Sequence, residues 1–136
     1  MAKPICRFPS VLNRVTNYPK TASVDANPGD FLTIVSGYAK RAESTTAKLL
    51  GVARSTWTND TNNTYVPVEE DEVGLFEVDT TTTLVRATHV GNAYDLTDHD
   101  AVALTATTYK VVTCLGITPE GRGLFRINKH FGNIAA

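Results

Sequence analysis

The densest group of side chains that could bind a metal or move protons lies in one short stretch, Asp95-Leu96-Thr97-Asp98-His99-Asp100. Its three carboxylates and one imidazole are ligands that divalent ions take in proteins. The stretch lacks the spacing, the central glycine and the closing Glu of an EF-hand loop. Turns in which Asp side chains bind nearby backbone N–H groups explain the same residues. We expect such turns and no bound metal. The alternative is a small metal-dependent or sugar-binding module that uses Asp95, Asp98, His99 and Asp100.

The other reactive side chains form no catalytic pattern. A nucleophilic Ser or Cys needs a neighbouring base and a third group that orients the base. Neither Cys6 nor Cys114 lies in such a signature, and no acid stands at an informative spacing from His89 or His130. The Gly-x-Gly at residues 121–123 lacks the Lys-Ser/Thr of a phosphate-binding loop. We therefore expect no enzyme activity, no catalytic residue and no cofactor. Two lone thiols are the expected state of the two cysteines, which lie far apart without a CxxC spacing, and the alternative is a disulfide between them.

Short strands are the elements that must position these residues. The chain has 136 residues, 42% of them hydrophobic and 20% charged, which is typical of one globular domain. Apolar runs rich in β-branched and aromatic residues alternate with Gly, Asn and Asp turns. Leu84–Val90 is read as one of the strands, and Pro67 limits Tyr65–Val68 to an edge strand.

The pattern predicts an all-β domain over residues 28–136, a small β-barrel or sandwich. The apolar members of the clearest strands should form one core, namely Leu50, Val52, Phe76, Val111, Val112, Phe125 and Ile127. No apolar run approaches the ~20 residues of a membrane-spanning helix, so we expect no membrane partner. The first twenty residues also lack the apolar core of a secretory signal, and we expect synthesis in the cytoplasm.

The first 27 residues have a different composition. They contain three prolines, four bases and one acid, with scattered apolar side chains. Proline disfavours a helix interior or a central strand, so we expect an extended N-terminal arm over residues 1–27. The arm would bind a neighbouring subunit, and the expected contact residues are Ile5, Arg7, Phe8, Val11, Leu12 and Arg14. The alternative is an edge strand of the same domain.

Charge is segregated along the chain. Residues 1–54 carry eight Lys or Arg and three acids, residues 55–100 carry one Arg and ten acids, and the remainder carries four bases and one acid. Such segregation indicates complementary faces, within the fold or between subunits, although solvated loops such as Glu69–Glu72 explain it equally well. No nucleic-acid-binding motif accompanies the basic arm, so we expect no nucleic-acid partner.

Two blocks of sequence resemble the capsid decoration, or cement, proteins of tailed bacteriophages. The first block comprises Pro28-Gly29-Asp30, Gly37 and Leu49–Ala53; the second comprises Val90–Leu96, Tyr109–Val112 and Gly123–Asn128. The resemblance covers most of residues 28–131. It implies a small β-rich protein that binds the outer surface of the phage head, clips neighbouring major capsid subunits together and often forms trimers. It brings no catalytic residue. Other virion components (tail-tube, head-completion or fibre domains) are the nearest alternative.

Overall fold

The structure, a computed structural model, describes residues 5–9, 13–20, 28–54, 65–71 and 73–128. These residues form eleven strands and one short helix, arranged in two sheets. The prediction of an all-β fold with a small barrel is therefore confirmed.

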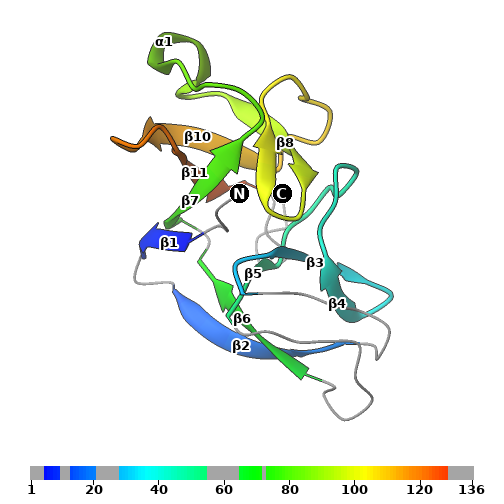
Figure 1. Ribbon diagram of the computed structural model, residues 1–136. Helices are drawn as coiled ribbons and strands as arrows, with labels where there is room; N and C mark the ends of the chain where they lie inside the picture. The colour runs from blue at the N-terminus through cyan, green and yellow to red at the C-terminus, as the bar shows by residue number, and fades with distance from the viewer. Residues whose placement is uncertain (1–4, 10–12, 21–27, 55–64, 72, 129–136) are drawn as a thin grey trace.

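The larger sheet closes into a five-stranded barrel, which fills the upper half of Figure 1. The strand order is β7-β11-β10-β8-β9, and the parallel pairing of β7 with β9 closes the ring. A further strand, β1 (Ile5–Phe8), pairs antiparallel with the first half of β7. The five barrel strands are β7 (Leu75–Thr80), β8 (Ala93–Asp98), β9 (Ala101–Ala103), β10 (Val112–Ile117) and β11 (Gly123–Ile127).

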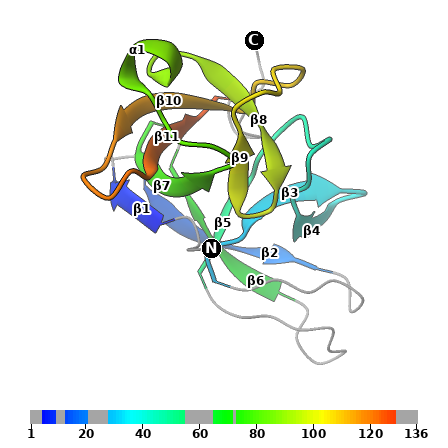
Figure 2. The same ribbon diagram turned by 45° about the horizontal axis from the view of Figure 1, so that its top comes forward.

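The second sheet lies below the barrel in Figures 1 and 2. Its order is β2-β6-β5-β3-β4, and all of its pairings are antiparallel. An isolated bridge between Lys20 and Ala39 joins its two outer strands, so the sheet curls almost into a ring. Its strands are β2 (Arg14–Pro19), β3 (Phe31–Val35), β4 (Tyr38–Arg41), β5 (Gly51–Ala53) and β6 (Tyr65–Glu70).

Two apolar clusters hold the sheets. The main cluster fills the barrel and extends to Phe31 and Val52 of the second sheet; the rings of Phe31 and Phe76 meet edge to face with centroids 6.3 Å apart. A smaller cluster lies within the second sheet and includes Leu50. All seven expected core residues are buried, but the expectation of one core is wrong for Leu50. The adjacent Leu49 belongs to the main cluster, because consecutive side chains in extended backbone point to opposite sides.

Two local expectations are also wrong. Residues 84–90 contain the helix α1 (Arg86–His89) instead of a strand, and Nδ1 of His89 accepts the N–H of Val85 at 2.8 Å. The strand β6 is not an edge, because it pairs with both β2 and β5. Its pairing with β5 involves only Val68 and Glu69, so the missing N–H of Pro67 costs that ladder nothing.

The N-terminal segment is extended, as expected, but its described strands belong to the two sheets of the same chain. The backbone of β1 pairs with β7, and β2 pairs with β6 from Arg14 opposite Glu70 to Pro19 opposite Tyr65. Pro9 follows β1 and Pro19 ends β2, so neither proline interrupts a strand. The described part of the segment thus has the alternative arrangement, strands of the same domain.

Candidate functional site

Asp30 stands at the start of β3, where three backbone hydrogen bonds fix the chain. The turn before it needs glycine, because Gly29 has a φ of 90°. The N–H of Gly29 donates to the carbonyl of Ala53 at 2.8 Å, and the N–H of Ala53 donates to the carbonyl of Asp30 at 2.9 Å. On the other side, the N–H of Phe31 donates to the carbonyl of His99 at 2.7 Å. The buried Asp30 therefore lies where the second sheet meets the turn between β8 and β9.

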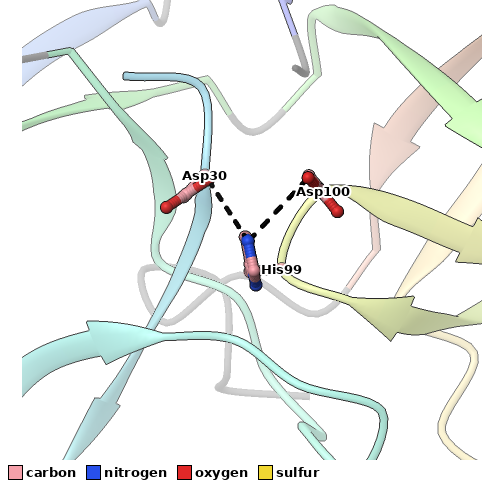
Figure 3. Close-up of side chains that lie close together, drawn as sticks. All are labelled: Asp30, His99 and Asp100. Carbon is pink, nitrogen blue, oxygen red and sulfur yellow. Dashed lines mark ion pairs between the residues drawn. The ribbon is translucent and has the colours of Figure 1, made fainter. Parts of the chain in front are cut away.

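That turn brings His99 and Asp100 to Asp30, as Figure 3 shows. Nε2 of His99 lies 3.7 Å from Oδ1 of Asp30 and 3.8 Å from Oδ2 of Asp100. One ligand atom from each of the three residues lies within 4.8 Å of the others. Asp30 is 0% exposed, whereas the side chains of His99 and Asp100 are 18% and 17% exposed. The three residues, called here the Asp30–His99–Asp100 cluster, thus reach from the protein interior to its surface.

Asp98 orients the imidazole of His99. Its Oδ1 lies 2.9 Å from Nδ1 of His99 and also accepts the backbone N–H of His99 at 2.8 Å. The backbone N–H of His99, followed by the His99 ring, holds the pKa of the Asp98 carboxyl below its ordinary value. An ionised carboxylate can only accept hydrogen bonds, so Nδ1 carries the proton. When the ring is protonated, its two N–H groups face Asp98 on one side and Asp30 and Asp100 on the other, and all three contacts are then ion pairs.

Asp95, from the same stretch of sequence, has a different role. Its carboxylate is buried and accepts three backbone N–H groups, from Thr108 at 3.1 Å and from Tyr109 and Lys110 at 2.7 Å each. Lys110 adopts a positive φ of 53°, so these bonds hold a constrained turn before β10. Asp98 accepts a backbone N–H within its own turn, as expected, whereas Asp95 holds a different turn that lies later in the chain. The four-residue set 95, 98, 99 and 100 is not brought together around one point.

Sequence reasoning missed Asp30 as a member of the cluster. Asp30 is far from His99 in the chain, and Pro28-Gly29-Asp30 was considered above only as part of the resemblance. The signal that sequence offers is weak, a lone acid directly before an apolar run. Its burial becomes apparent only when the β8–β9 turn covers it.

The acidic turn at residues 69–72 is not a solvated loop, so that expectation is wrong for its described residues. Glu70 and Asp71 are 1% and 0% exposed. Glu70 accepts from Arg14 at 3.2 Å and from the hydroxyl of Tyr18 at 3.4 Å. Burial and the charge of Glu70 raise the pKa of Tyr18. Asp71 caps the following turn by accepting the N–H groups of Val73 and Gly74.

A second charged group lies on the barrel. The guanidinium of Arg122 donates to Oε2 of Glu77 and to Oδ1 of Asp79, each at 2.7 Å. Its side chain is 15% exposed, and Glu77 is 7% exposed. The Gly-x-Gly turn at 121–123 thus positions Arg122 to bind two carboxylates of β7. The motif therefore has a structural role.

The remaining sequence candidates have structural positions or lie outside the described residues. Cys114 is a free thiol inside the barrel, and burial raises its pKa. His89 caps α1 and packs edge to face on Tyr94. His130 lies outside the described residues, as does the side chain of Cys6.

The expected contact residues of the arm are only partly described. Ile5, Arg7 and Phe8 lie in β1, for which the structure describes the backbone, and Val11 and Leu12 lie outside the described residues. Arg14 pairs with Glu70 of its own chain. No helix among the described residues is long and apolar enough to cross a membrane.

Comparison of the chain with protein-family models, curated proteins and solved structures finds no match.

Proposed function

We propose that this protein is a non-catalytic virion component, a decoration protein that binds the outer surface of a tailed-phage head and stabilises contacts between major capsid subunits. Its partners are the major capsid protein and further copies of itself, with a trimer as the expected oligomer. The proposal includes no nucleic-acid and no membrane partner.

The observation that carries the proposal is that the residues behind the resemblance are those on which this fold depends. In the first block, Gly29 and Gly37 have φ values of 90° and 86°, which favour glycine. Gly51 has no room for a side chain, because a Cβ there would overlap the carbonyl oxygen of Glu69. In the second block, Gly91 has a φ of 94°, and Asp95 binds the turn before β10. The resemblance thus rests on the turns and close contacts of both sheets.

A surface suited to binding another protein supports the proposal. Strand alternation places Val15, Val35, Tyr38 and Tyr65 on the same side of the second sheet as Phe31 and Val52. Phe31 and Val52 are buried against the barrel. The other four lie at the margins of that side and are 51%, 49%, 45% and 59% exposed, in the order given. We call these four side chains the apolar margin.

Partly exposed tyrosines such as Tyr38 and Tyr65 are typical of protein interfaces, where aromatic side chains bury a large area. In the proposed function, the apolar margin faces the major capsid protein of the shell. The chemistry required of this surface is packing and hydrogen bonding, which agrees with a non-catalytic role.

Co-sedimentation tests the proposal. The purified protein is mixed with undecorated heads assembled from the major capsid protein of the same genome and then pelleted. We expect saturable binding at a copy number close to that of the major capsid protein. Absence of binding would refute the decoration role. Saturation at a few copies per head would instead favour a head-completion or tail component.

Paired variants test whether the apolar margin makes the contact. Tyr38→Ser combined with Tyr65→Ser should abolish sedimentation with heads while circular dichroism stays that of the parent. Leu115→Ser is the matched control, because Leu115 is 42% exposed on the barrel, outside the apolar margin. Equal binding by the double variant and the control would show that the contact lies elsewhere on the chain.

A further inference from the structure

We propose that a pocket beside the β3–β4 hairpin binds one carboxylate, that of an Asp or Glu side chain of the major capsid protein. The pocket has a volume of about 210 Å³. It is lined by Thr33, Val35 and Lys40 of the hairpin, by Arg41 at its end, and by residues 43 and 45–47 of the loop that follows. We call it the hairpin pocket; Figures 1 and 2 show the hairpin at the edge of the second sheet. The inference rests on the proposed function, because it names a contact of the same surface.

Hydrogen bonds hold the loop wall of the hairpin pocket in place. Oγ1 of Thr33 donates to the carbonyl of Lys48 at 2.8 Å, which ties the hairpin to the far end of the loop. Within the loop, the N–H of Thr46 donates to the carbonyl of Glu43 at 3.0 Å, and Oγ1 of Thr46 accepts the N–H of Glu43 at 2.9 Å. Both threonines are buried. The walls therefore stand before a ligand binds, which lowers the ordering cost of binding.

The two cations of the hairpin pocket make no ion pair within the described residues. None of the acids described there lies within 4 Å of the charged groups of Lys40 or Arg41. The backbone N–H of His99 is the main cause of the low pKa of the Asp98 carboxyl, and the charge of Arg41 is a smaller one. Arg41 thus acts on Asp98 from beyond ion-pair distance. The exposed Lys40 is the cation with more of its charge left for a ligand.

The charge of the hairpin pocket selects a ligand with one negative charge. The ionisable lining residues are Lys40, Arg41 and Glu43, so two positive charges and one negative leave +1. One carboxylate brings this sum to zero, whereas a phosphate dianion would leave excess negative charge beside Glu43. In the part of the chain that the structure describes, the hydroxyl of Thr46 has no acceptor of its own and can donate to the carboxylate.

Size and position indicate a protein side chain as the source of the carboxylate. Small-molecule sites commonly enclose about 300–1,000 Å³, which is more than the hairpin pocket offers. Val35 lines the pocket and also belongs to the apolar margin. Val35 pairs with Tyr38, and Thr33 pairs with Lys40, so these four side chains share one side of the hairpin. A capsid segment packed on the apolar margin can therefore place an acidic side chain in the pocket.

Co-sedimentation with undecorated heads tests the pocket when charge variants are compared with the parent. Lys40→Gln should weaken binding roughly tenfold, because charge-assisted hydrogen bonds are the strong ones. Glu43→Gln removes the competing carboxylate and should tighten binding about two- to fivefold. Lys48→Gln is the matched control, since it removes the same charge from a lysine that does not line the pocket. Salt screens a pair enclosed by pocket walls less than exposed charges, so these differences should persist at about 0.15 M salt.

A titration without heads tests the pocket separately from the virion role. The probe is N-acetylglutamate N-methylamide, and the corresponding glutamine derivative is its uncharged control. In amide NMR spectra of the full chain, the glutamate probe should shift the resonances of residues 33–35 and 40–47, and Lys40→Gln should abolish these shifts. Equal shifts with the glutamine probe, or shifts confined to other residues, would overturn the carboxylate site. Inorganic phosphate at the same ionic strength should bind more weakly than the glutamate probe, and tighter binding of phosphate would also overturn it.

The two tests separate the failure of this inference from that of the proposed function. If the parent binds heads and Lys40→Gln binds them equally well, the pocket is refuted and the decoration role stands. If the parent binds the glutamate probe but no heads, the decoration role is refuted, and the capsid with it as the source of the carboxylate, whereas the carboxylate site stands.

Discussion

Removal of the Asp95 carboxylate should destabilise the protein more than any surface change. Asp95 is 4% exposed and accepts three backbone N–H groups, those of Thr108, Tyr109 and Lys110. Hydrogen bonds to a charged group contribute about 1.5–3 kcal/mol each. Thr108 and Lys110 are exposed, so their N–H groups regain some water when the carboxylate is lost. Taking about 1–1.5 kcal/mol for each bond, Asp95→Ala should lower the free energy of unfolding by about 3–4.5 kcal/mol.

Asp95→Asn removes the charge of the side chain but keeps its shape, so it separates the contribution of the charge from that of the hydrogen-bond geometry. One amide oxygen can still accept from Tyr109 and Lys110, but the amide nitrogen would face the N–H of Thr108, so we expect about half the loss. Urea unfolding followed by circular dichroism measures both variants, and Asp95→Ala should melt roughly 10–15 °C lower than the parent. Glu120→Gln, an exposed carboxylate in another turn, is the control. A loss for Asp95→Ala no larger than that of the control would refute the assigned role of the carboxylate.

Three further predictions follow from other contacts. Arg122→Ala leaves Glu77 and Asp79 without their shared guanidinium and should cost about 2–4 kcal/mol in urea unfolding; a loss below 1 kcal/mol would contradict a clamp. Because burial raises the pKa of Cys114, the folded protein keeps a proton that the unfolded thiol releases above about pH 8.5, so stability falls as pH rises further. Cys114→Ala should flatten that slope between pH 7 and 10, and an unchanged slope would exclude this thiol as its cause. Deletion of residues 1–20 removes β1 and β2 and should give a chain that circular dichroism shows to be unfolded or aggregated. A folded product would show that the domain does not need these strands and would favour a separate N-terminal arm.

The fold class could be predicted from sequence because alternation and turn residues are local signals. The core residues Phe76 and Phe125 lie in such runs, and both are fully buried. Local signals do not reveal pairing between distant strands. The strand β6 looked like an edge because of Pro67, yet β2 pairs with its outer side. The helix α1 was missed because residues 84–90 are apolar enough for a strand, whereas Val85 and Arg86 are exposed.

The candidate site was only half predictable for the same reason. The β8–β9 turn supplies His99 and Asp100 as sequence neighbours, so their proximity was expected. Asp30 reaches them only because β3 starts against that turn, which is a tertiary contact. Asp95 was grouped with them by sequence, although it accepts backbone N–H groups of a different loop.

The distribution of charge also limits which surface of the protein a partner can bind. Sequence suggested that basic ends meet an acidic middle within or between subunits, and several of these charges pair within the chain. Arg14 contacts Glu70, and Arg54 lies 3.8 Å from Glu69. These ion pairs within the chain use acids of residues 55–100, and the same acids would be needed for ion pairs with a neighbouring subunit. If the protein binds a shell, its contact should therefore depend more on the apolar margin than on long-range charge attraction. Binding to heads should then change little as salt rises through about 0.15 M, where exposed charges are screened beyond about 8 Å. A steep loss of binding over that range would show that charged residues make the main contact with the heads.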